Sequence, residues 1–217
     1  MEIYISRHGT TAWNREGKIQ GRTDIDLDDR GIRMAEETSR ALKDMGLSFD
    51  LVFSSPLKRA FETARILSPG SEVVKDERLT ELFFGKHEGE KASLMPFFGS
   101  DPAKYNELAP SYGAESLAEL LNRTSDFMKD KIEPLAGSDL KVLISGHGAM
   151  NRGLLMYIRG TRDFSDFWGS GLQPNCGITK VILSLDQDGS VRYERSGNSQ
   201  TYYDDSLRID QNKLLGD

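Results

Sequence analysis

The sequence contains little cysteine and little histidine. One cysteine, Cys176, and three histidines occur in 217 residues. A single cysteine excludes an intrachain disulfide and a zinc site built on several thiolates. Such a chain suits a reducing compartment, so we expect a cytoplasmic protein in which Cys176 is a small buried residue.

Long apolar runs are absent as well. No run approaches the roughly 20 residues that a membrane-spanning helix needs, and the first residues lack the basic and apolar segments of a signal peptide. We therefore expect neither a membrane span nor a membrane partner.

An excess of positive charge is also missing. The chain has 28 Lys and Arg against 34 Asp and Glu, and 28 − 34 gives a net charge of −6. No overall field attracts nucleic acid, so any site for an anion has to be local. The length suits one large domain over residues 1–217 that can hold an inserted cap. No internal repeat or low-complexity linker divides the chain.

Strand and helix patterns alternate along the chain. This order predicts an α/β fold, a three-layer α/β/α sandwich around a mainly parallel central sheet. The expected strands are residues 2–6, 51–53, 73–74 and 141–145, followed by a hairpin of residues 178–185 and 191–195. The expected helices begin after Asp28 and after Ser55, and cover residues 115–132 and 148–158.

The first two helix starts carry local signals. Asp28 is a typical capping residue, and Gly46 is a typical stop. Ser55 is expected to cap the next helix, with Pro56 at its first position. The apolar face of the first helix is expected to hold Ile32, Ala35, Leu42 and Met45.

A less regular stretch from Glu81 to Gly113 is rich in aromatic residues. We expect a small helical cap inserted at about residues 83–115. Its aromatic side chains suit either the core of the cap or a wall of a substrate pocket. They are Phe83, Phe84, Phe97, Phe98, Tyr105 and Tyr112.

Basic side chains follow three of the expected strands. Arg7 and His8 come directly after the first strand, Arg59 lies early in the helix after the second, and His147 follows the fourth between two glycines. Ligands of open α/β sheets bind beyond the carboxyl ends of the strands, where helix N-termini favour anions. Two imidazoles and two guanidiniums are therefore expected at one edge of the sheet, in an anion site.

Four motifs carry the candidate residues in a fixed order. They are Arg-His-Gly-Thr-Thr at residues 7–11, Ser-Ser-Pro-Leu-Lys-Arg-Ala at residues 54–60, Leu-Thr-Glu at residues 79–81, and Ser-Gly-His-Gly at residues 145–148. With these motifs the chain resembles the histidine phosphatase superfamily, the phosphoglycerate mutase-like group, from residue 2 to about residue 183. One departure is His87, where these proteins often carry a tryptophan.

The resemblance implies a phosphohistidine mechanism. His8 would attack phosphorus and carry the phosphoryl group, and Glu81 would protonate the leaving oxygen and then act as base for water. The catalytic residues that the resemblance implies are His8, Glu81, His147, Arg7 and Arg59. The substrate and phosphate-binding residues that it implies are Arg7, Asn14, Gln20, Gly21, Arg59, His147 and Gly148.

The resemblance also implies that no metal ion and no cofactor is needed, because fixed cations stabilise the charge of the transition state. A metal site formed by His8, His87 and His147 is the alternative. It is disfavoured because an arginine next to a metal cation repels it.

Glu81 needs particular surroundings for its role. A carboxyl group that donates a proton near neutral pH has to be shielded from water. Phe83 and Phe84 are neighbours in the sequence that would provide this shielding. The alternative is a solvated glutamate, which is the usual condition of this residue type.

The other candidates have structural alternatives too. A lone arginine is most often part of a surface ion pair, and His147 alone would suit a helix cap or the core. Gln20 and Gly21 suit turn and capping roles equally well. Only the expected convergence at one sheet edge favours the functional interpretation.

The acceptor of the phosphoryl group separates a phosphatase from a mutase. In this family a mutase goes with a longer insertion rich in basic residues, whereas residues 88–119 contain only Lys91 and Lys104 as cations. The sequence therefore predicts a metal-independent phosphatase of the histidine acid type that hydrolyses small phosphomonoesters, with a small phosphorylated metabolite as its substrate. A cofactor-dependent phosphoglycerate mutase and a non-catalytic phospholigand-binding module stay open as alternatives. A homodimer is open as well.

Overall fold

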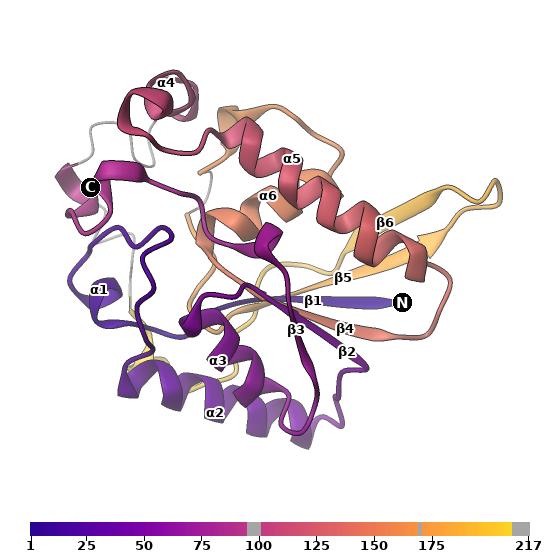
Figure 1. Ribbon diagram of the computed structural model, residues 1–217. Helices are drawn as coiled ribbons and strands as arrows, with labels where there is room; N and C mark the ends of the chain where they lie inside the picture. Colours follow the sequence, from indigo (N-terminus) through magenta and orange to yellow (C-terminus); the bar gives the residue numbers. More distant parts are fainter. Residues whose placement is uncertain (95–100, 169–170, 210–217) are drawn as a thin grey trace.

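A six-stranded mixed sheet runs through the centre of the computed structural model, which describes residues 1–94, 101–168 and 171–209 (Figure 1). The strand order is β3-β2-β4-β1-β5-β6. The first four of these strands are parallel, and β5 and β6 form an antiparallel hairpin at one edge. The strands are β1 (Glu2–Arg7), β2 (Leu51–Ser54), β3 (Val73–Lys75), β4 (Lys141–Gly146), β5 (Ile178–Leu185) and β6 (Val191–Arg195). The predicted mainly parallel sheet is confirmed.

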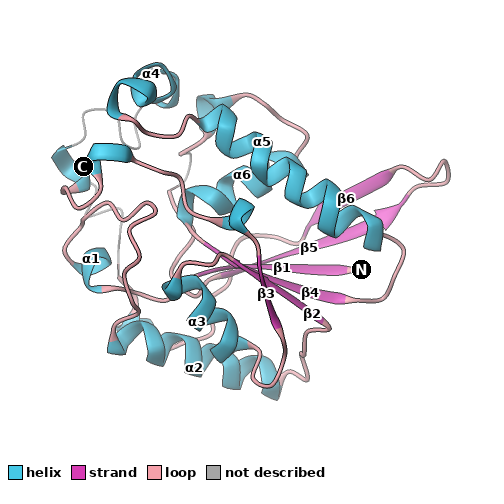
Figure 2. Ribbon diagram, in the orientation of Figure 1, coloured by secondary structure: helices cyan, strands magenta, loops and turns pink. Residues whose placement is uncertain are grey.

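Helices cover both faces of the sheet, as Figure 2 shows. The two helices α2 (Asp29–Asp44) and α3 (Lys58–Leu67) lie on one face, and α5 (Leu117–Phe127) and α6 (Gly148–Ile158) lie on the other. The short helix α1 (Ala12–Arg15) follows β1 in the sequence, and α4 (Pro102–Leu108) contacts α5. The three predicted layers are therefore present.

The central strand β1 is buried on both faces, as is typical of parallel strands. Ile3 and Ile5 pack in a cluster with residues of α5 and α6. Tyr4 points the other way and packs with residues of α2 and α3. Alternating apolar side chains in one short strand thus connect the two helical layers.

The second helix start was predicted wrongly. Its first helical residue is Lys58, and Ser55 is still paired with the sheet, since its backbone N–H donates to the carbonyl oxygen of Ser145 at 3.0 Å. The Oδ1 atom of Asp24 accepts the N–H of Lys58 at 2.8 Å. A carboxylate far away in the sequence therefore replaces the local cap.

The apolar face of α2 is rotated from the predicted one. Ala35 and Leu42 are buried as expected, but Met45 is 55% exposed and Ile32 is only partly buried. Gly31 lies against the backbone of Thr10, where an added Cβ would overlap main-chain atoms. This close approach turns the face that holds Gly31 toward the sheet. The capping role predicted for Asp28 is confirmed.

The segment between β3 and α5 contains α4 and several single turns of 3₁₀-helix. It includes the predicted insertion, of which residues 95–100, with Phe97 and Phe98, lie outside the described residues. Phe84, Tyr105 and Ala109 of this segment pack into the same cluster as β1 and β4. Within the described ranges, no helix is both long and apolar enough to cross a membrane.

The predicted helix over residues 115–132 begins two residues later than expected. Ser116 caps α5 by accepting the N–H of Glu119, and Met128–Ile132 continues the helix as a π-helical turn. The helix predicted at residues 148–158 has the expected bounds.

Candidate active site

The residues predicted to converge do meet at the carboxyl ends of β1, β2 and β4. Arg7 and His8 follow β1, Arg59 is the second residue of α3, and His147 lies between β4 and α6. A pocket at this edge is lined by Arg7, His8, Asn14, Gln20, Gly21, Arg59 and Glu81. The sheet topology thus brings together side chains from opposite ends of the chain.

His8 is buried and fixed in one tautomer. Its Nδ1 atom lies 2.6 Å from the carbonyl oxygen of Gly9. A carbonyl can only accept, so Nδ1 carries the proton and the lone pair of Nε2 is free. Burial, and then the charges of Arg59 and Arg7, hold the pKa of His8 well below its usual value. His8 is therefore neutral near pH 7, as a nucleophile has to be.

Arg7 and Arg59 supply two positive charges that form no direct ion pair among the described residues, although burial, which lowers the pKa of both, is partly offset by the nearby Glu81 carboxylate. Arg7 donates to the carbonyl oxygen of Gln173 at 2.7 Å, and Arg59 donates to those of Thr23 at 2.8 Å and Gly21 at 2.6 Å. Burial lowers the pKa of both guanidiniums to about 10, so both stay charged. Among the described residues neither forms an ion pair, and both Nε atoms are buried without a partner. Fixed positive charge of this kind, held by carbonyl oxygens and not by a direct ion pair, is suited to an anion.

His147 lies beside His8, with 5.2 Å between the ring centroids. It occupies the N-cap position of α6, but its side chain does not cap the helix. Both ring nitrogens are buried and have no hydrogen-bond partner within the described part of the chain. Burial, and then the charge of Arg59, holds the pKa of His147 well below its usual value. His147 is fully buried and does not itself line the pocket, so its neutral imidazole, with two unused nitrogens, is a hydrogen-bond donor next to His8 and not at the pocket surface.

Glu81 reaches the same pocket from the segment after β3. Its Oε1 atom accepts the N–H groups of Leu82 and Met150, both at 2.9 Å, and Oε2 accepts that of Ala149 at 3.2 Å. The expected shielding by Phe83 and Phe84 is thus only part of the environment. Phe84 lines the pocket, but the carboxylate itself contacts N–H donors at the start of α6.

Asn14, Gln20 and Gly21 line the pocket and also have structural roles. The Oδ1 atom of Asn14 accepts the N–H of Thr11 at 3.1 Å in a capping box, and Gln20 accepts the Thr11 hydroxyl at 3.0 Å. Gly21 has a φ of +52°, and an added Cβ would overlap the Glu88 carboxylate. The turn roles considered for these residues are therefore present together with their place in the pocket.

Gly148 lies outside the lining of this pocket and borders a second cleft next to it. An added Cβ at Gly148 would lie 3.6 Å from the Cζ atom of Arg7. His87 also lies outside, where Nδ1 pairs with Glu90 at 2.7 Å and the ring packs on Tyr112. It is not brought together with His8 and His147.

The walls of the pocket include residues that the sequence analysis did not single out. They are Gly17, Lys18, Ile19, Ala92, Ala149 and Leu172. Trp168 is buried against Phe167 and Tyr105 and also lines the pocket. These positions come from separate parts of the chain, so no local pattern marks them.

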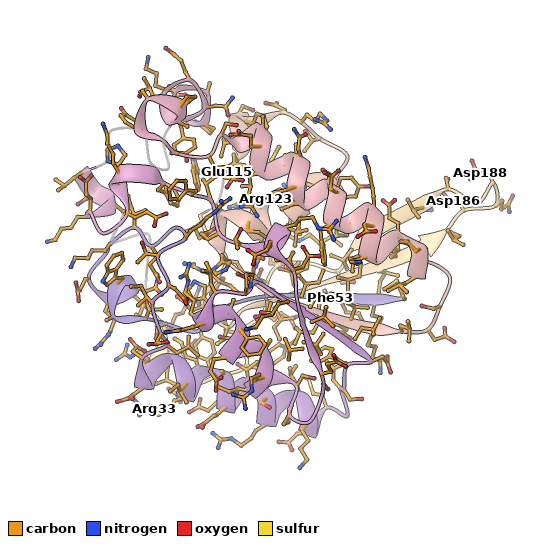
Figure 3. All side chains as sticks on the ribbon, in the orientation of Figure 1. Arg33, Phe53, Glu115, Arg123, Asp186 and Asp188 are labelled. Carbon is orange, nitrogen blue, oxygen red and sulfur yellow. The ribbon has the colours of Figure 1, made fainter. Side chains whose placement is uncertain are left out.

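Two charged residues hold the loops around the pocket. The carboxylate of Glu88 accepts the N–H groups of Arg22 at 2.8 Å and Thr23 at 2.9 Å. Arg123 pairs with Glu115 at 2.6 Å and donates to the carbonyl oxygen of Glu81 at 3.1 Å. Figure 3 labels Glu115 and Arg123 side by side above the sheet. The segment that carries Glu81 is therefore fixed from α5.

Comparison with protein families gives one match that spans most of the chain. The matching description is "Histidine phosphatase superfamily (branch 1)", over residues 3–195. A phosphoglycerate mutase of Schizosaccharomyces pombe is 32% identical over 168 residues, covering 73% of this chain and 79% of the relative. A 2,3-bisphosphoglycerate-dependent phosphoglycerate mutase of Streptococcus pneumoniae is 27% identical over 197 residues, covering 75% and 86%.

Solved structures with the same fold include phosphatases. A phosphoserine phosphatase of Entamoeba histolytica is 26% identical with a TM-score of 0.74, covering 92% of this chain and 97% of its own. A mycobacterial glucosyl-3-phosphoglycerate phosphatase is 23% identical with a TM-score of 0.76, covering 92% and 99%. At that lower identity the likeness concerns the fold alone.

Proposed function

The chain belongs to the histidine phosphatase superfamily, and we propose that it is a metal-independent phosphatase of small phosphomonoesters that forms a phosphohistidine on His8. The observation that carries the proposal is the arrangement around His8. Its free Nε2 lone pair lies in a pocket with two buried arginines, neither of which forms a direct ion pair with a described carboxylate. A nucleophile and an electrostatic cradle are the two parts that phosphoryl transfer needs.

In the first step, Nε2 of His8 attacks the phosphorus atom of the bound ester. The N–P bond forms as the bond between phosphorus and the leaving oxygen breaks. Arg7 and Arg59 hold the remaining oxygens, and together with the neutral imidazole of His147 they stabilise the charge that develops on these oxygens. Because these groups are already fixed by carbonyl oxygens and by burial, little reorganisation is needed during the reaction.

The leaving oxygen receives a proton from Glu81 in this proposal. The two carboxylate oxygens differ, since Oε1 accepts two N–H groups at 2.9 Å and Oε2 accepts one at 3.2 Å. Oε2 is therefore the oxygen that can carry a proton at the smaller cost in hydrogen bonds. Oε1 would keep the carboxyl group attached to the start of α6 during the transfer.

In the second step, water attacks the phosphohistidine. Glu81, now a carboxylate, takes a proton from this water, the N–P bond breaks, and inorganic phosphate leaves with His8 restored. The same carboxyl group thus acts first as acid and then as base.

The residues that line the pocket indicate which kind of substrate fits it. Ile19, Phe84, Trp168 and Leu172 give the pocket an apolar side, and Lys18, which pairs with Glu16, also lines it. This lining suits a small phosphomonoester with a partly apolar body.

A phosphoglycerate mutase is the second candidate, because two curated relatives carry that name. A mutase passes the phosphoryl group of His8 back to a substrate hydroxyl and keeps water out. Residues 88–119 contain only Lys91 and Lys104 as cations, which favours water as the acceptor.

The two functions are separated by measuring products. Purified protein is incubated with 3-phosphoglycerate and a bisphosphoglycerate primer, and in parallel with a panel of phosphomonoesters. We expect release of inorganic phosphate to exceed conversion to 2-phosphoglycerate. Conversion that exceeds phosphate release would establish the mutase, and the absence of both would indicate a binding module.

A further inference from the structure

A second cleft lies next to the candidate active site and has no part in the proposed reaction. Its volume is about 430 Å³. Its walls come from four parts of the chain, which are α6 with Arg159, residues 171–174, residues 195–199 and Arg208. Four arginines line it, and they are Arg152, Arg159, Arg195 and Arg208.

No aspartate or glutamate is among the described residues that line this cleft. Arg159, Arg195 and Arg208 form no ion pair with any residue in the described ranges, whereas Arg15, Arg65 and Arg78 each pair with a carboxylate. Four positive charges thus gather in one hollow of a chain whose net charge is −6. A concave surface lined by one sign of charge concentrates ions of the opposite sign.

Arg195 is partly buried, whereas Arg159 and Arg208 are exposed. The Nε atom of Arg195 is buried and has no hydrogen-bond partner within the described residues. Burial, and then the charge of Arg159, lowers the pKa of Arg195, which indicates that the two guanidiniums repel each other across the cleft. Like charges in partly buried positions are stabilised when an anion lies between them.

The cleft is separate from the phosphate pocket. Arg7 and His8 line the pocket but not the cleft, and Gly148 lines the cleft but not the pocket. Leu172 lines both, so it forms part of the wall between them. One phosphomonoester in the active site therefore leaves Arg159, Arg195 and Arg208 without an anionic partner among the described residues.

We propose that this cleft binds a small ligand that carries two or more phosphate groups. Guanidinium groups recognise phosphate through paired N–H donors, and several of them favour a ligand with several phosphates. The volume lies in the range of small-molecule sites, which is roughly 300–1,000 Å³. The proposal does not depend on the proposed function, because it uses none of the catalytic residues.

Calorimetric titration with inorganic tripolyphosphate tests the proposal. All proteins carry His8→Ala, so that the probe is not turned over and any binding in the phosphate pocket is common to them. The test variant adds Arg159→Gln and Arg195→Gln. The matched control adds Arg162→Gln and Arg192→Gln, two exposed arginines outside the cleft with the same change in charge.

We expect the test variant to bind one equivalent of tripolyphosphate fewer than the control. Equal binding by the test variant and the control would overturn the proposal. If both bind less than the protein that carries His8→Ala alone, and by the same amount, the loss comes from net charge and the proposal is likewise overturned. Arg208→Gln is a second test that does not depend on folding of the double variant, since Arg208 is exposed and lies outside any helix or strand. We expect it to raise the dissociation constant of tripolyphosphate about tenfold, which corresponds to the loss of one charge-assisted contact. An unchanged dissociation constant would contradict the proposal.

Discussion

Two arginine sites lie side by side in this protein and are built in opposite ways. In the phosphate pocket, Arg7 and Arg59 are buried and held by backbone carbonyl oxygens. In the neighbouring cleft, Arg159 and Arg208 are exposed and form no ion pair with any described residue. Fixed charge stabilises a transition state because it needs no reorganisation, whereas loosely held charge suits binding alone. The comparison predicts that substitutions of the arginines in the pocket reduce function strongly, whereas conservative substitutions of the arginines in the cleft reduce binding only slightly.

The largest effect is expected at Arg59. Arg59→Gln removes one fixed charge and should lower kcat/KM for a chromogenic phosphomonoester by about 100- to 1,000-fold, the typical result of losing one transition-state donor. Arg65→Gln is the control, because Arg65 is on the same helix but exposed and paired with Glu62. Circular dichroism checks that the variant folds. A loss of less than about tenfold would contradict the role of Arg59.

A smaller but more specific effect is expected at Glu81. Glu81→Gln keeps the shape but cannot donate the proton, so hydrolysis of esters with poor leaving groups should slow by about 100-fold and that of good leaving groups much less. Glu77→Gln is the control, an exposed glutamate in the same segment. Equal slowing for all leaving groups would mean that Glu81 does not donate a proton.

The buried imidazoles predict how stability depends on pH. The pKa values of His8 and His147 are well below 6.5 in the folded protein, while the unfolded chain titrates near 6.5. As the pH is lowered below about 6.5, the unfolded state binds more protons than the folded state. The free energy of unfolding therefore falls by up to about 1.4 kcal/mol for each pH unit of acidification and for each of the two histidines. Urea unfolding at pH 7.5, 6.5 and 5.5 measures this slope. His147→Asn should reduce the slope and His87→Ala should not, and an equal slope in His147→Asn and the unchanged protein would refute the assignment.

The smallest effect is expected when an arginine of the cleft is replaced by lysine. Arg159→Lys keeps the charge at an exposed position, so tripolyphosphate binding should weaken by less than about threefold. Arg59→Lys loses two fixed hydrogen bonds and should lower kcat/KM by at least about tenfold. Similar effects at both positions would remove the distinction between the two sites.

The sequence predicted the convergence of Arg7, His8, Arg59 and His147 because strand ends define it. A basic residue directly after a parallel strand can only lie at one edge of the sheet, whatever the loops do. The bounds of α6 were predicted for a similar reason, since the glycines around His147 and the apolar run after it are local signals.

Features that depend on contacts distant in sequence were not predicted. The start of α3 depends on Asp24, and the environment of Glu81 depends on the N–H groups of Ala149 and Met150. The arginine cleft joins four separate parts of the chain. No local pattern in the sequence encodes such contacts, so only the folded arrangement reveals them.

The central claim is that His8 carries the phosphoryl group. The protein is mixed with a chromogenic phosphomonoester, quenched in alkali because phosphohistidine is labile to acid, and measured by intact-mass and peptide spectrometry. We predict a mass increase of one phosphoryl group on the peptide that contains His8, present in His87→Ala and lost in His8→Ala together with phosphate release. Phosphate release that continues undiminished in His8→Ala would contradict the account.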